Sequence, residues 1–135
     1  MTEHEDRQDI SDLLVRYATG IDRHDWPLFR TVFTDDCQLD YGEIGTWHGV
    51  AAVTEFMEGS HAGVQSLHRM SNQAITVDGD KAEARTYVDM VMVGEGTSGV
   101  NAIGYYDDEI VRTDDGWRIA HRHFTSVRLS TFGDA

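Results

Sequence analysis

The residues of this sequence that could perform chemistry together are an aspartate, a histidine and a tyrosine. Tyr17 and Asp22 lie close together in the sequence, and His68 follows in a later segment, Ser66–Asn72. A carboxylate beside an imidazole makes a proton-transfer pair, because the anion orients the ring and stabilises its charged form. A nearby phenol can donate a hydrogen bond to an oxygen that gains negative charge. The three residue types therefore predict acid–base chemistry.

No other segment of the sequence offers a recognised metal motif, phosphate-binding loop or nucleophile elbow. His121 and His123 have the i, i+2 spacing of two metal ligands, but no third ligand stands at a recognised spacing. We therefore expect neither a metal nor a cofactor, and we expect His121 to line a pocket or an interface. Cys37, between Phe33 and Leu39, is typical of a buried apolar residue rather than a nucleophile.

Composition limits the classes of partner. The 135 residues are enough for one domain spanning 1–135 with a core of its own. The formal net charge of -13 argues against nucleic acid and against an anionic membrane surface, which both attract clustered Lys and Arg. A single cysteine excludes an internal disulfide. We expect no signal peptide, because the first residues are acidic and polar, and no membrane-spanning segment, because no apolar run is long enough. We expect a cytoplasmic protein.

The first part of the sequence predicts three helices. Thr2 can cap the first helix and Gly20 can stop it, and one apolar face recurs along this segment at helical spacing. The residues of that face are Ile10, Leu13, Leu14, Tyr17, Ala18 and Ile21. Asp25 can cap a second helix. A short strand from Cys37 to Tyr41 and a third helix over Val50–Met57 follow.

The second part of the sequence predicts long strands. Turn signals at 78–80, 95–99 and 113–116 separate four extended segments, near 64–77, 81–94, 100–112 and 117–129. Helices followed by a run of hairpins indicate an α+β fold, with the helices on one face of an antiparallel sheet.

Period-two counting assigns the strand side chains to faces. In the second long strand one face is small and apolar and should lie against the helices, with room for a ligand. Its members are Ala82, Ala84, Thr86, Val88, Met90 and Met92.

The same counting gives two further predictions. The first long strand has a face of mixed polarity, which is typical of a pocket wall, formed by His68, Met70, Asn72 and Ala74. In the last strand it places His121 and His123 on one face with Trp117 and Ile119. Arg122 is expected to pair with a carboxylate.

Five segments, spread over nearly the whole chain, carry a family resemblance. They are Leu14–Trp26, Phe33–Asp36, Leu67–His68, Val77–Asp80 and Asp115–Ile119. Together they resemble the SnoaL-like proteins of the nuclear transport factor 2-like superfamily, which include scytalone dehydratase and bile acid 7α-dehydratase. The resemblance implies a cone-shaped α+β barrel, in which three N-terminal helices pack in a curved, mostly antiparallel sheet around a pocket.

The resemblance also implies roles for individual residues. In the lyases of this group an aspartate after the first helix and a histidine in the next long strand do acid–base work, and Asp22 and His68 match them. Tyr17 matches a tyrosine of the bile acid dehydratase, and Tyr41 a pocket tyrosine of scytalone dehydratase. Both dehydratases carry a further ionisable residue late in the following strand. Here strand parity favours Met90 at that position, with Asp89 beside it.

We therefore expect a cofactor-independent acid–base lyase of the dehydratase type. Its substrate would be a small, largely apolar, oxygenated molecule such as a polyketide, steroid or terpenoid. His68, held by Asp22, would remove a proton, and Tyr17 with Asn72 would hydrogen-bond the oxygen that gains charge. The alternatives are an isomerase or cyclase that uses the same pair, or a non-catalytic binding or subunit-type protein.

Two further expectations concern contacts. Met70 and Met90 should line the pocket, because methionine adapts to apolar ligands of irregular shape. The outer face of the sheet carries Tyr87, Val91 and Val93 among charged residues and could support a homodimer or a higher homo-oligomer.

Overall fold

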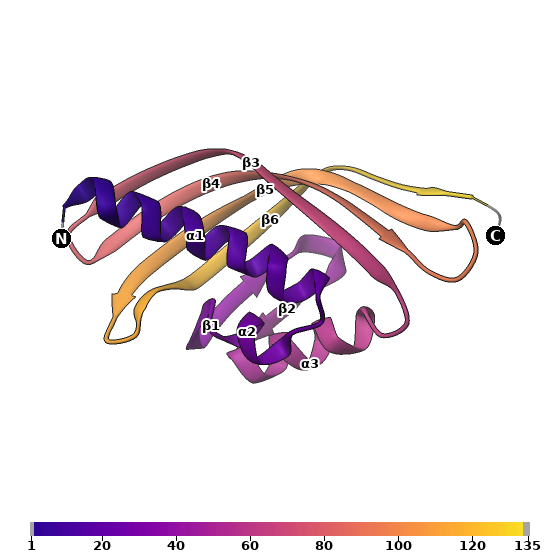
Figure 1. Ribbon diagram of the computed structural model, residues 1–135, viewed down its shortest axis with the longest axis horizontal. Helices are drawn as coiled ribbons and strands as arrows, with labels where there is room; N and C mark the ends of the chain where they lie inside the picture. Colours follow the sequence, from indigo (N-terminus) through magenta and orange to yellow (C-terminus); the bar gives the residue numbers. More distant parts are fainter. Residues whose placement is uncertain (1, 134–135) are drawn as a thin grey trace.

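A computed structural model describes residues 2–133 of the chain as an open, curved sheet with helices on its concave side (Figure 1). The helices are α1 (Glu3–Asp22), α2 (Trp26–Arg30) and α3 (Val50–Ser60), with one 3-10 turn, η1 (Gly42–Ile44). The strands are β1 (Phe33–Asp40), β2 (Thr46–His48), β3 (Gln65–Asp78), β4 (Lys81–Val93), β5 (Gly99–Thr113) and β6 (Gly116–Phe132). No helix among the described residues is long and apolar enough to cross a membrane.

The predicted α+β fold is confirmed. The six strands follow the order β2-β1-β6-β5-β4-β3, and every neighbouring pair is antiparallel except β1 with β6. The long strands β3 to β6 arch over the helices, and α1 runs along β3 (Figure 1). Because β2 and β3 are both edge strands, the sheet is curved but does not close into a barrel.

The first helix begins as predicted and ends later. The Thr2 hydroxyl accepts a hydrogen bond from the backbone N–H of Glu5, which caps the helix. The helix then continues through Gly20 to Asp22. Gly20 lies so close to α2 that a Cβ atom there would stand 2.9 Å from the Cα of Phe29. Gly20 therefore allows α1 and α2 to pack closely. Because the helix continues for two residues past Gly20, its last residue, Asp22, lies over the sheet.

The apolar face of β4 lies against the helices, as predicted. Ala82, Ala84, Thr86 and Val88 are buried, and the pairing with β5 runs without a shift along the whole strand. This unbroken alternation puts Met90 on the inner face. Asp89 faces outward, where it forms an exposed ion pair with Arg69 at 2.7 Å.

A β-bulge overturns the predicted face of β3. The pairing of β3 with β4 shifts between Ser71 and Ala74, and Asn72 has a left-handed φ of 51°. Beyond the bulge the alternation is reversed, so Asn72 and Ala74 are exposed while Ile75 packs against the core. His68 and Asn72 therefore do not share a face.

A second bulge overturns the predicted face of β6. Ile110 pairs with Ile119, but the next residue back, Glu109, pairs with His121, so that Ala120 is the extra residue. Trp117 and Ile119 point inward, as predicted. After the bulge Arg122 and Phe124 are the buried residues, and His121 and His123 lie on the outer face.

A polar contact ties the start of α1 to the hairpin between β5 and β6. Arg112 donates two hydrogen bonds of 3.0 Å to the buried carboxylate of Asp6, and the Trp117 indole N–H donates a third, of 3.3 Å. The Arg112 guanidinium also stacks 4.4 Å from the Trp117 ring centroid. Arg112 and Trp117 therefore fix the first turn of α1 on the sheet, away from the cavity.

Candidate active site

A cavity of about 170 Å³ lies between the helices and the inner face of the sheet. Its walls are mostly apolar and aromatic and include Ile21, Phe56, Val88, Met92, Ala102 and Phe124. Ile44 and Leu129, which also line it, are 46% and 58% exposed, so the cavity opens to solvent at their end. The polar groups are few and come from Tyr17, Tyr41, Ser60, His61, His68 and Tyr106. A mostly apolar cavity with a few convergent polar groups is typical of a small-molecule site.

The structure brings Asp22 and His68 together at this cavity. The Nδ1 atom of His68 lies 2.7 Å from Oδ1 of Asp22, and the two side chains are 4% and 15% exposed. The other carboxylate oxygen, Oδ2, accepts a hydrogen bond of 2.8 Å from the backbone N–H of His68. Ser66 donates a further bond of 2.8 Å to Oδ1. Asp22 therefore fixes both the position and the rotation of the imidazole.

These contacts determine the tautomer of His68. An ionised carboxylate can only accept hydrogen bonds, so Nδ1 must carry the hydrogen that lies between His68 and Asp22. In the neutral ring Nε2 is then an unprotonated acceptor, which can take a proton as a general base.

Asp22 is held in its charged form. Burial alone would raise the pKa of the carboxyl, but the hydrogen bonds from the His68 ring and backbone and from Ser66 outweigh it. The pKa of Asp22 therefore lies below its ordinary value of 3.8. A permanently ionised Asp22 can stabilise the imidazolium that forms when His68 accepts a proton.

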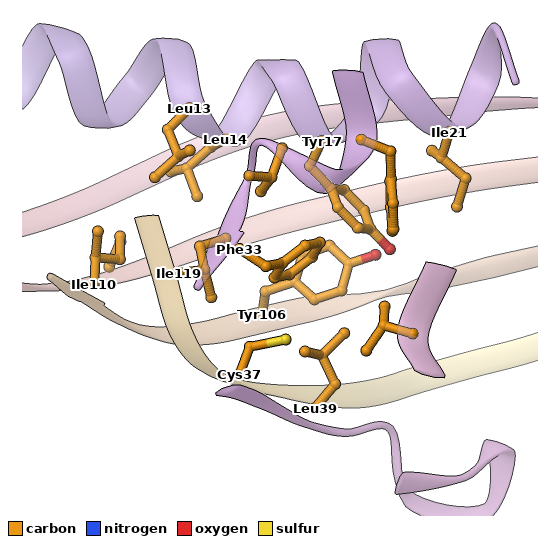
Figure 2. Close-up of a cluster of buried hydrophobic side chains, with 14 of the residues drawn as sticks. Leu13, Leu14, Tyr17, Ile21, Phe33, Cys37, Leu39, Tyr106, Ile110 and Ile119 are labelled. Carbon is orange, nitrogen blue, oxygen red and sulfur yellow. The ribbon is translucent and has the colours of Figure 1, made fainter. Parts of the chain in front are cut away.

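Three tyrosines meet beside His68. The Tyr17 and Tyr41 hydroxyl oxygens are 2.9 Å apart and hydrogen-bonded, and the Tyr17 ring stands edge-on to His68 at 5.9 Å between centroids. The hydroxyl groups of Tyr17 and Tyr106 point to the same region from α1 and β5 (Figure 2). Burial raises the pKa of both Tyr41 and Tyr106 well above the ordinary value of 10. These two phenols therefore stay protonated and able to donate.

A fully buried cation lies behind the tyrosines. The Arg122 guanidinium stacks 4.3 Å from the Tyr17 ring centroid and 3.9 Å from that of Tyr106. Arg122 also donates two hydrogen bonds, of 2.7 and 2.9 Å, to Asp108. The sequence predicted a carboxylate partner for Arg122 but did not identify the residue. Burial would lower the pKa of Arg122, but the Asp108 charge raises it well above its ordinary value. The guanidinium is therefore charged.

The remaining predicted site residues are divided between the cavity and the rest of the molecule. Met90 lines the cavity. Met70 is half-buried and packs against the core without lining the cavity, and Asn72 is exposed at its bulge. His121 lies on the outer face, 3.2 Å from Glu109. Parity reasoning failed for Asn72 and His121 because each is placed by a bulge that the period-two pattern does not reveal.

Among the cavity-lining residues that sequence reasoning did not assign to the site are two rings that carry a polar atom, those of His61 and Tyr106. Tyr106 lies at an inward position of β5, which alternation along that strand could have indicated. His61 follows the last turn of α3, where no sequence pattern marks it. Among residues 2–133 no three His, Cys, Asp or Glu side chains are grouped as metal ligands would be.

The chain belongs to the SnoaL-like domain family, which it matches over residues 2–123. This confirms the resemblance found in the sequence. A relative, the uncharacterised protein Rv2910c of Mycobacterium tuberculosis, is 32% identical over 126 residues, covering 90% of this chain and 86% of the relative.

Solved structures share the architecture. A proposed aromatic ring hydroxylase from Novosphingobium aromaticivorans has a TM-score of 0.89 at 32% identity, covering 98% of this chain and 96% of that one. A proposed scytalone dehydratase from the same species has a TM-score of 0.86 at 20% identity, covering 96% and 89%. At that lower identity the second likeness concerns the fold alone.

Proposed function

We propose that this protein is a cofactor-independent acid–base lyase of the dehydratase type. The observation that carries the proposal is the Asp22–His68 pair at the wall of an apolar cavity, with the Nε2 atom of His68 left as the basic atom. The walls around the pair are mostly apolar, and the electrostatic interactions of a developing charge are stronger in such surroundings than in bulk solvent.

In the proposed reaction His68 removes a proton from a carbon next to a substrate carbonyl. The proton moves to Nε2, and the resulting imidazolium is stabilised by the ionised Asp22. The electron pair of the broken C–H bond moves toward the carbonyl oxygen, which becomes an enolate. The hydroxyl pair of Tyr17 and Tyr41 can donate one hydrogen bond to that oxygen, and the charge of Arg122 behind Tyr17 favours the anion.

Elimination then completes the reaction. The electron pair of the enolate returns to form a carbon–carbon double bond, and the bond from the neighbouring carbon to its hydroxyl group breaks. The His68 imidazolium gives its proton to the departing oxygen, so that water leaves and the neutral imidazole is restored. General acid–base catalysis of this kind contributes about 10²–10⁴-fold to a rate.

The volume of the cavity restricts the substrate. Cavities of about 150 Å³ hold a molecule the size of benzene, so a cavity of about 170 Å³ encloses about one ring, and a second ring would extend toward the open end at Ile44 and Leu129. The likeness at 32% identity to a proposed aromatic ring hydroxylase also supports a ring-containing ligand. Among the expected substrates this favours a small polyketide over a steroid, whose four rings would extend through the mouth.

An isomerase is the second candidate. The observation that favours it is the apolar side chain of Met90 in the cavity wall. In the two dehydratases that the sequence resembles, another ionisable residue is expected at this position. With one base at work, the proton on His68 could return to a different carbon of the same substrate, and no group would leave.

A direct test uses 3-hydroxy-1-tetralone, a two-ring β-hydroxy ketone whose dehydration gives 1-naphthol. We expect conversion by the parent protein and a loss of about 10²–10⁴-fold in kcat/KM for His68→Ala. Asp22→Asn and the double variant should lose a similar amount, because residues that act as a unit are not additive. Asp89→Asn removes an exposed carboxylate from the opposite face and is the matched control.

Two outcomes contradict the proposal. Full turnover by both single variants would make the Asp22–His68 pair structural. Binding of the ketone by the parent without turnover or proton exchange would favour the non-catalytic binding protein.

A further inference from the structure

A second histidine of the cavity has an unused nitrogen. His61 follows α3, is 4% exposed and lines the same cavity as His68. Its Nδ1 atom lies 2.9 Å from the Met57 carbonyl oxygen and 3.0 Å from the Ser60 hydroxyl. A carbonyl oxygen only accepts hydrogen bonds, so Nδ1 carries the hydrogen, and in the neutral ring Nε2 is an acceptor.

The Nε2 atom of His61 is buried and has no hydrogen-bond partner among residues 2–133. Most buried polar atoms are paired, and leaving one unpaired costs about 1–3 kcal/mol. Because His61 lines a cavity, the missing partner can be supplied by a bound molecule. That molecule must offer a hydrogen-bond donor at this point.

The surroundings of His61 keep the ring neutral. Burial lowers its pKa, and the neighbouring His68 and His24 act in the same direction, while the Met57 carbonyl and Asp22 oppose them. The rings of His68, Trp26 and His24 lie 6.3, 6.4 and 6.5 Å from that of His61, between centroids. The two cavity histidines are nearly parallel, with 29° between their planes.

We propose that His61 is a substrate-binding residue whose Nε2 accepts a hydrogen bond from the hydroxyl group that leaves during elimination. This inference rests on the proposed lyase function and adds a substrate class to it, namely β-hydroxy carbonyl compounds. A hydroxyl group that donates its hydrogen to His61 keeps its lone pairs free. One of them can then receive the proton that His68 has taken from carbon.

The two histidines would therefore have different tasks. His68 carries the proton from carbon to oxygen, and His61 orients the oxygen without changing its own protonation state. The polar group that the inner face of β4 lacks at Met90 is supplied in this chain from the end of α3.

Two related probes separate these tasks. Hydrogen–deuterium exchange at C2 of 1-tetralone, followed by NMR in D₂O, needs only proton removal by His68. Dehydration of 3-hydroxy-1-tetralone needs in addition the hydroxyl contact. His61→Phe should lower kcat/KM for dehydration by about 10-fold, the value of one hydrogen bond, and leave the exchange rate of 1-tetralone within twofold of the parent.

A conservative variant and a binding measurement complete the test. His61→Gln places an amide oxygen near the position of Nε2 and should recover part of the dehydration rate. By calorimetry His61→Phe should bind 3-hydroxy-1-tetralone more weakly than the parent does but 1-tetralone equally well. Equal losses on both probes, or no loss on either, would overturn the assignment of His61.

Failure of the proposed function would look different. If neither the parent nor His68→Ala catalyses hydrogen–deuterium exchange at C2 of 1-tetralone, His68 is not a base. The calorimetric comparison would still decide for or against the hydroxyl contact of His61.

Discussion

The chemistry open to each site residue depends on which of its atoms are already engaged. Both oxygens of Asp22 accept hydrogen bonds from β3, so this carboxylate orients its neighbour and is not itself available to a substrate. His68 uses Nδ1 for Asp22, which leaves Nε2. The phenols of Tyr17 and Tyr41 share one hydrogen bond, so only one of their two hydroxyl hydrogens is used within the pair.

The tyrosine pair can be tested by removing one oxygen at a time. Tyr17→Phe should keep the buried ring and lower kcat for 3-hydroxy-1-tetralone by about 10²–10³-fold, the usual cost of losing one donor to a developing oxyanion. Tyr41→Phe should have an effect of the same direction. The matched control is Tyr105→Phe, since Tyr105 lies on the outer face under Arg85. Unchanged kcat in both variants would exclude the pair from catalysis.

At the scale of secondary structure, the ends of elements and their irregularities place the site. Helix α1 must run past Gly20 for Asp22 to reach β3, and close packing of α2 on Gly20 permits that. The bulge at Ala120 turns Arg122 and Phe124 inward, and the bulge at Asn72 ends the pocket wall of β3. Without the bulge at Ala120, β6 would present His121 and His123 to the helices.

The bulge of β3 gives a prediction about stability without a change in activity. Asn72 has a φ of 51°, a conformation that asparagine and glycine tolerate and β-branched residues do not. Asn72→Val should lower the free energy of unfolding by about 1–2 kcal/mol, measured by urea denaturation, whereas Asn72→Gly should stay close to the parent. Both should keep the parent's kcat/KM, because the side chain is exposed outside the cavity. A lower kcat/KM for Asn72→Gly, without a loss of stability, would show that the Asn72 side chain takes part in the reaction.

At the scale of the molecule, contacts between distant parts of the chain hold the helices on the sheet. Asp6 joins the first turn of α1 to Arg112 and Trp117, and the buried Arg122–Asp108 pair joins β6 to β5. The outer face of the sheet, with Tyr87 exposed, remains the predicted contact surface of a homodimer.

The Asp6 contact predicts how stability depends on pH. The hydrogen bonds from Arg112 hold the pKa of Asp6 below its ordinary value of 3.8 in the folded protein. The folded state therefore binds the proton less tightly than the unfolded state does. The stabilisation of the folded state by the Asp6 charge is complete above the pKa that Asp6 has in the unfolded chain. It is lost as the pH falls through the lower pKa that Asp6 has in the folded protein.

Thermal unfolding of the parent and of Asp6→Asn should show this. We expect the parent to have the higher Tm at pH 7, and the difference to shrink steadily below about pH 4, where carboxyl groups titrate. Asp80→Asn is the control, since Asp80 also contacts Arg112 but is exposed. A difference that stays constant down to pH 2 would show that the Asp6 charge contributes nothing.

The sequence by itself determined the order of helices and strands, the inner face of β4 and the pairing of an aspartate with a histidine. Those features follow from local periodicity, from capping residues such as Thr2 and Asp25 and from the family resemblance. Tertiary structure alone decided which side chains meet at the cavity. The reason is that an extra residue in a strand reverses every later side chain, as at Ala120, and nothing in a period-two pattern reveals it. For the same reason Arg122 and not His121 lies under the tyrosines, and only the packing of α3 on the sheet places His61 beside His68.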